Sequence, residues 1–156
     1  MRKTVLSATE ASQRSPIGTW LDIENLAAVE VSSEDPAHPF EAALHGGNGE
    51  GWRASGPGPQ VIRLIFNEPT VVRRIRLEFR EASRERSQEF FLSATSDTGE
   101  KHQIARQQWN FSPTGSTTEV EDFSVNLSDV ADVTLEIDPG RHNRDALATL
   151  RSIAIG

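Results

Sequence analysis

The chain has 156 residues, of which 16 are Lys or Arg and 23 are Asp or Glu, so its net charge at pH 7 is −7. A chain of this length with 36% hydrophobic residues can form one domain with a sizeable core. The absence of cysteine excludes disulfides, thiol nucleophiles and Cys-based metal sites. The acidic balance argues against non-specific binding to nucleic acid or anionic lipid, and no apolar run approaches the ~20 residues of a membrane helix.

The first 16 residues are rich in Ser, Thr and Gln, which predicts a flexible N-terminal arm. They lack the apolar stretch of a secretory signal, so we expect a cytoplasmic location. Residues 17–156 are predicted to form a single domain, with Trp20, Leu21 and Ile23 packed on it.

Apolar residues then recur with a period of two, the pattern of strands with one buried face. The predicted strands are 26–32, 60–66, 71–79, 88–95, 102–111, 119–127, 132–137 and 148–155. In the clearest of them, Val71, Ile75, Leu77 and Phe79 are expected to share the buried face.

Turn sequences separate these strands, such as Gly56-Pro57-Gly58-Pro59, Asn67-Glu68-Pro69 and Asp138-Pro139-Gly140. Only residues 39–44 are typical of a helix, with Pro39 suited to its first turn. Many short strands at regular spacing predict an all-β fold: an antiparallel β-sandwich of the jelly-roll type, with about eight strands and one short helical turn.

Arginine is concentrated in residues 53–86, which hold eight of the 14 arginines and carry a net charge of +4. An ordinary solvated face with cross-strand Arg–Glu pairs accounts for this pattern. Two functional alternatives remain: a surface that contacts an acidic protein partner, and a weak nucleic-acid interface, which the overall charge disfavours.

Several polar residues at strand ends are candidates for ligand binding. Arg53 follows Trp52, which we expect in the core, so Arg53 is predicted to point toward solvent or the loops. Arg84 and Arg86 precede the strand at 88 and could hold an acidic sugar or a phosphate. A soluble loop and structural ion pairs are the alternatives.

Two further loops contribute candidates. Trp109 and Phe111 share one face of a strand end, while Gln108 and Asn110 present amides that can bind sugar hydroxyls or cap a turn. The polar loop 140–145 contains His142 and Arg144, which are the remaining candidate ligand-binding residues.

No enzymatic motif is present. The four histidines, His38, His45, His102 and His142, lack metal-site spacing, and there is no nucleophile elbow, P-loop or dinucleotide fingerprint. We therefore expect a non-enzymatic protein without a cofactor.

The order of elements resembles the discoidin, or coagulation-factor type C, family. The similar segments are Ser32-Ser33-Glu34, 38–44, 51–55, Gly58-Pro59-Gln60, the strands 61–66 and 71–79, and 88–93 followed by Asp97-Thr98-Gly99. The resemblance covers roughly residues 26–155, and its motifs are mostly structural.

The resemblance implies a galactose-binding-like sandwich whose loops at one end bind a ligand, most often a sugar and sometimes a lipid head group or a protein. It implies that the loop with His142 and Arg144 borders the ligand. His45-Gly46 stands where the family has an Asp-Gly calcium turn, which disfavours Ca²⁺. The predicted function is non-catalytic carbohydrate recognition, with a protein-interaction module as the alternative and no membrane partner.

Overall fold

The computed structural model describes residues 20–44 and 49–156, so the predicted arm at 1–16 and the candidate calcium position at His45 lie outside the described residues. The elements are α2 (Ile23–Leu26), β1 (Ala27–Val31), the 3-10 turn η2 (Phe40–Ala43), β2 (Trp52–Arg53), β3 (Gln60–Arg80), β4 (Arg86–Ser96), β5 (Lys101–Phe111), β6 (Thr118–Asp138), β7 (Thr149–Leu150) and β8 (Ser152–Ile155). None of the helices in the described ranges is long and apolar enough to span a membrane.

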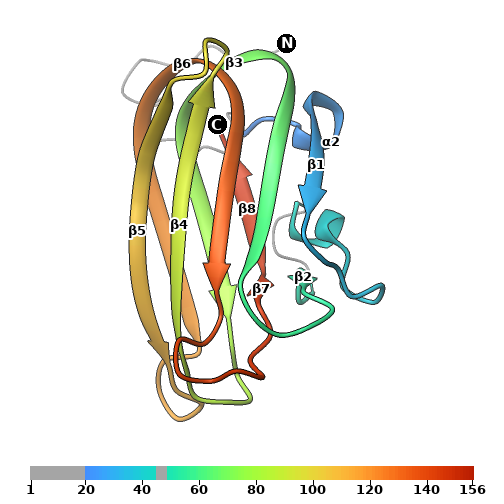
Figure 1. The fold of residues 1–156 in the computed structure, drawn as a ribbon, viewed down its shortest axis with the longest axis vertical. Helices are drawn as coiled ribbons and strands as arrows, with labels where there is room; N and C mark the ends of the chain where they lie inside the picture. The colour runs from blue at the N-terminus through green and yellow to red at the C-terminus, as the bar shows by residue number, and fades with distance from the viewer. Residues whose placement is uncertain (1–19, 45–48) are drawn as a thin grey trace, which may run out of the picture.

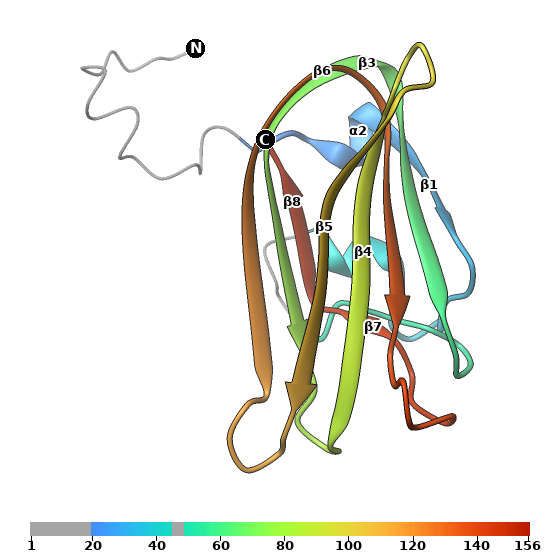
Figure 2. The ribbon, with the colours of Figure 1, turned by 60° about the vertical axis from the view of Figure 1, so that its left-hand side comes forward.

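The strands form two facing layers joined by two long, bent strands, β3 and β6 (Figures 1 and 2). The first half of β3 pairs with β1 and with the second half of β6, which in turn pairs with β4 and then β5. The second half of β3 pairs with the first half of β6 and with β8. Every strand pair is antiparallel, which confirms the predicted all-β sandwich.

The bends replace turns that the sequence pattern suggested. Residues 60–66 and 71–79 were predicted as separate strands but form the single strand β3, which arches over through Asn67-Glu68-Pro69 (Figure 2). Register shifts between Ile65 and Arg74 mark this bend, where Pro is tolerated because the ladder is interrupted. In the same way, 119–127 and 132–137 form the single strand β6, with Asp129 at a positive φ of 57°.

The bend also makes one predicted side-chain orientation wrong. Val71 was expected in the core, but it is 43% exposed, whereas Val72 is fully buried. A bulge changes which side of the strand a residue faces, and register shifts lie on both sides of Val72. Beyond the bulge Ile75, Leu77 and Phe79 are fully buried, as predicted.

The core lies between the layers and extends toward the small sheet formed by β2 and β7. Phe79 stacks on Phe90 from the facing layer, with 5.3 Å between the ring centroids. Trp52 is fully buried, as predicted, and its indole nitrogen donates a hydrogen bond to the Ser33 carbonyl. Ile23 of α2, a turn that the sequence analysis did not predict, is also buried.

Buried Gln60 and its contacts give a structural role to two of the segments that resemble the discoidin family, Ser32-Ser33-Glu34 and Gly58-Pro59-Gln60. Its side-chain oxygen accepts hydrogen bonds from the hydroxyls of Ser32 and Ser33, at 2.5 and 2.8 Å. These contacts join the end of β1 to the start of β3. The similar segments around these residues are therefore structural.

Candidate functional site

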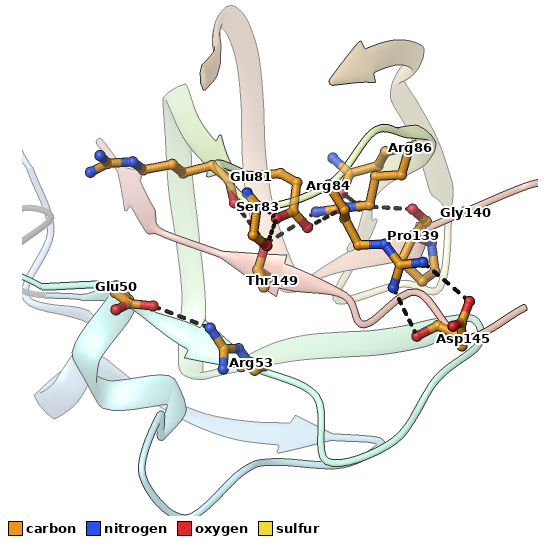
Figure 3. Close-up of polar contacts among 12 residues, drawn as sticks. Glu50, Arg53, Glu81, Ser83, Arg84, Arg86, Pro139, Gly140, Asp145 and Thr149 are labelled. Carbon is orange, nitrogen blue, oxygen red and sulfur yellow. Dashed lines mark hydrogen bonds and ion pairs between the residues drawn. The ribbon is translucent and has the colours of Figure 1, made fainter. Parts of the chain in front are cut away.

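A hollow of about 540 Å³ is lined by residues near the ends of β2, β3 and β7. The loops there lie at the end of the sandwich opposite the bends of β3 and β6 (Figure 1), and Figure 3 shows several of the side chains. Three separate stretches of chain form it: Glu50 and Arg53 around β2, the connection that follows β3, and the segment that leads into β7. The described residues that line it are Glu50, Arg53, Arg80, Glu81, Ala82, Ser83, Arg84, Asp145, Leu147 and Thr149. Its size is within the range of small-molecule sites.

Arg53 lies on one side of this hollow in a chain of charged groups. Its guanidinium donates a hydrogen bond to Glu50 at 3.1 Å, and the His38 ring lies 3.8 Å from the same Glu50 oxygen. The other His38 ring nitrogen is 3.4 Å from Asp35. A backbone hydrogen bond from Ala37 and the neighbouring His38 hold the pKa of Asp35 below its ordinary value.

Arg84 lies across the hollow from Arg53 (Figure 3). Its guanidinium donates to the side-chain oxygen of Asp145 at 3.2 Å and to the Asp145 carbonyl at 3.4 Å. Asp145 is 81% exposed, so this pair is weak and can be replaced by a ligand oxygen at little cost.

Arg86 lies beneath the hollow with its side chain fully buried. It donates hydrogen bonds to Glu81 (2.9 Å), to Gln88 (2.9 Å), to the Pro139 carbonyl (2.8 Å) and to Thr149 (3.3 Å), and its guanidinium lies 4.8 Å from the centre of the Phe111 ring. These contacts tie together the ends of β4, β6 and β7. We therefore assign Arg86 to the scaffold of the loops and not to direct ligand contact, for which the sequence had suggested it.

Burial and the ion pair between Glu81 and Arg86 act in opposite directions on the pKa of each group. Burial would raise the pKa of Glu81, but hydrogen bonds from Ser83 and Arg86 outweigh it and hold that pKa below its ordinary value. Burial lowers the pKa of Arg86, and Glu81 partly offsets that effect. The negative charge of Glu81 is thus offset by Arg86 of the scaffold, although the Glu81 side chain borders the hollow.

Another acid, Glu119, lies on β6 and is only 1% exposed. Burial, together with the neighbouring carboxylate of Glu121, raises its pKa to about 8. Glu119 is therefore protonated at neutral pH.

The other predicted site residues do not line the hollow. Gln108 is exposed on β5, where its amide donates to Ser87 and accepts from Arg141, each at 3.1 Å. Asn110, also on β5, lies opposite Ser87 in the strand register. His142 and Arg144 are exposed on the loop between β6 and β7, next to the segment that lines the hollow.

The sequence analysis missed the other residues that line the hollow: Glu50, Arg80, Glu81, Ala82, Ser83, Asp145, Leu147 and Thr149. For Arg80 a signal was available, because it ends the clearest strand at the loop that was already selected. Ser83 lies in the same loop as Arg84, and Asp145 lies in the polar loop 140–145 that was also selected. Glu50 and Thr149 reach the hollow through the pairing of β2 with β7, two two-residue strands that no periodicity can reveal.

The concentration of arginine does not form a continuous basic face. Within the described residues, five of the eight arginines between 53 and 86 form ion pairs, and Arg63 pairs with Glu30 directly opposite it on the neighbouring strand. The pairs are Arg53–Glu50, Arg63–Glu30 and Arg63–Asp132, Arg74–Asp122, Arg84–Asp145 and Arg86–Glu81. Arg63 and Arg74 form the predicted cross-strand pairs. The pairs of Arg53 and Arg84 involve loop residues, and Arg86 is buried.

Within residues 20–44 and 49–156, no group of three or more metal-ligating side chains occurs. The hollow instead offers guanidinium donors, the hydroxyls of Ser83 and Thr149, carboxylate acceptors and the apolar side chain of Leu147. This set can bind a small polyhydroxylated molecule through hydrogen bonds.

Residues 28–141 match the model of the F5/8 type C domain, and the chain therefore belongs to the F5/8 type C, or discoidin, domain family. The resemblance seen in the sequence is confirmed. No curated protein matches the chain.

Solved structures with this fold include carbohydrate-binding modules of family 32. The module of NanJ from Clostridium perfringens, solved with galactose, is 14% identical over 88% of this chain and 97% of its own, with a TM-score of 0.64. CpGH89CBM32-5 from the same organism, solved with GalNAc-β-1,3-galactose, is 16% identical over 88% and 99%, with a TM-score of 0.64. The module of AlyQ, solved with 4,5-unsaturated mannuronic acid, is 19% identical over 88% and 98%, with a TM-score of 0.60.

Proposed function

We propose that this domain is a non-catalytic carbohydrate-binding module and that its ligand occupies the hollow at the loop end. The observation that carries the proposal is the convergence of hydrogen-bonding side chains from three stretches of chain on one hollow of about 540 Å³. Sugars bound by structures of the same fold add support. Because the contacts are few, we expect weak affinity unless several copies act together.

The proposal is tested by titrating the isotopically labelled domain with a panel of neutral and acidic sugars while amide shifts are recorded. We expect shifts clustered at residues 50–53, 80–84 and 145–149. No shifts at millimolar sugar would contradict carbohydrate binding. Shifts confined to 108–110 would place the ligand on β5 instead.

One substitution tests the position of the site. Arg84→Ala removes a donor from the hollow, and we expect it to weaken sugar binding about tenfold or more, since hydrogen bonds from charged groups contribute about 1.5–3 kcal/mol. Arg106→Ala is the matched control, because Arg106 also forms an exposed ion pair, with Glu89, but lies away from the hollow. Equal affinities of the two variants would count against the site.

A further inference from the structure

The charges around the hollow cancel in pairs, with one exception. Arg53 pairs with Glu50, Arg84 pairs with Asp145, and Glu81 is neutralised from below by Arg86. Arg80, which ends β3 and borders the hollow, has no acidic partner for its exposed guanidinium in the described part of the chain. The hollow therefore has one uncompensated positive charge at its edge.

The described lining of the hollow contains no aromatic side chain. A neutral sugar gains much of its affinity by placing an apolar ring face against an aromatic ring, and here only Leu147 offers an apolar side chain of any size. Binding in this hollow must therefore depend on hydrogen bonds and charge.

The whole molecule offers no general attraction for anions, because its net charge is −7. An anionic ligand is therefore held best by a local group whose charge no neighbouring carboxylate offsets. Arg80 is such a group, and its planar fork of donors matches the two oxygens of a carboxylate.

We propose that the ligand is a sugar carrying a carboxylate, a hexuronic acid unit, and that Arg80 donates hydrogen bonds to that carboxylate. This inference rests on the proposed function. Ring hydroxyls are then bound by Arg53, Arg84 and Thr149 across the hollow (Figure 3). The exposed pairs of Arg53 and Arg84 leave donors for these hydroxyls, because surface ion pairs contribute little and Asp145 is mostly in water.

The test uses three ligands that share one arrangement of ring hydroxyls: a hexuronic acid, its methyl ester and the parent hexose, in the gluco, galacto and manno series. Affinities are measured by amide-shift titration with the wild-type domain, Arg80→Gln and Arg73→Gln. Arg73 is the matched control, because it is also exposed on β3 but lies outside the hollow. Unchanged amide spectra away from residue 80 establish that the variants are folded.

We expect the wild-type domain to bind one acid about tenfold more tightly than its methyl ester. Arg80→Gln should abolish this preference while the ester binds as before, and Arg73→Gln should keep it. Binding of the hexose and the ester as tightly as the acid would overturn the inference and leave the proposed function intact. Binding of none of the three in any series would overturn both.

A fourth ligand, the hexose 6-sulfate, distinguishes carboxylate recognition from attraction for any anion. Weaker binding of the sulfate than of the uronic acid supports the proposal. Equal binding of the two, with equal loss in Arg80→Gln, would overturn the assignment to a carboxylate.

Discussion

Arg86 shows that an arginine beside the candidate site can belong entirely to the scaffold of the loops. Its guanidinium is buried, paired with Glu81 and bonded to the Pro139 carbonyl, so it holds three chain segments in place. Arg84, two residues earlier, is partly exposed and bonded to a solvated aspartate. The two side chains differ because β4 begins at Arg86 and directs that residue inward.

Replacing Arg86 with Met should destabilise the domain strongly. The change removes the guanidinium donor from one carboxylate oxygen of Glu81 and from the Pro139 carbonyl, and breaking a buried ion pair costs about 3–5 kcal/mol. Urea unfolding monitored by tryptophan fluorescence measures the loss. Arg84→Met is the control and should cost less than about 1 kcal/mol. Similar unfolding midpoints for the two variants would show that the buried network does not carry this stability.

At the scale of elements, the alternation of buried and exposed residues extends beyond the apolar residues of a strand and also predicts which polar residues are buried. Phe90, Leu92 and Ala94 share one face of β4, and the same alternation continued backward places Gln88 and Arg86 inside. The same step along β6, from Phe123 backward, places Glu119 inside. The sandwich and most strand faces were therefore predictable from periodicity. The bend that exposes Val71 was not predictable, because a bulge reverses the alternation of buried and exposed residues and has no characteristic residue pattern here.

The candidate site was predictable only in part. Arg53 and Arg84 were selected because they lie beside strand ends, where loops meet. Glu50 and Thr149 reach the hollow because β2 pairs with β7, a contact between residues about 100 positions apart. Such contacts cannot be predicted from the local sequence.

The small sheet of β2 and β7 depends on Gly51. This residue has a positive φ of 76°, and a Cβ atom there would collide with the backbone of Leu150 and Arg151. We expect Gly51→Ala to cost more than about 2 kcal/mol of folding free energy, measured by urea unfolding. Gly99→Ala is the control, because Gly99 has a φ of 90° with open space around it, and its cost should be about 1 kcal/mol. A cost for Gly51→Ala no larger than that of the control would contradict the close approach.

For the molecule as a whole, pH should affect stability in two opposite ways. Folded Glu119 keeps its proton up to about pH 8, whereas the unfolded chain releases it near 4.5, so stability falls as pH rises between these values. The lowered pKa values of Glu81 and Asp122 contribute stability above their ordinary pKa, and it is lost as pH falls through the folded values. Maximum stability is therefore expected near pH 5.

Urea midpoints measured from pH 4 to pH 9 check this expectation. Glu119→Gln should remove the decline between pH 5 and 8, a slope of at most about 1.4 kcal/mol per pH unit, and become more stable than wild type above pH 8. A decline of the same slope in this variant would assign the pH dependence to another group.

The two bent strands have a consequence for how the domain folds. β3 and β6 each contribute to both layers, and their partners are separated by tens of residues along the chain. Neither layer can therefore assemble as an independent hairpin that later docks on the other, because completing one brings strands of the second into place. We expect slow, cooperative folding dominated by non-local pairing, with the polar loops at the far end ordered last. The sequence of those loops can therefore change without altering the strand pairings that form the two layers.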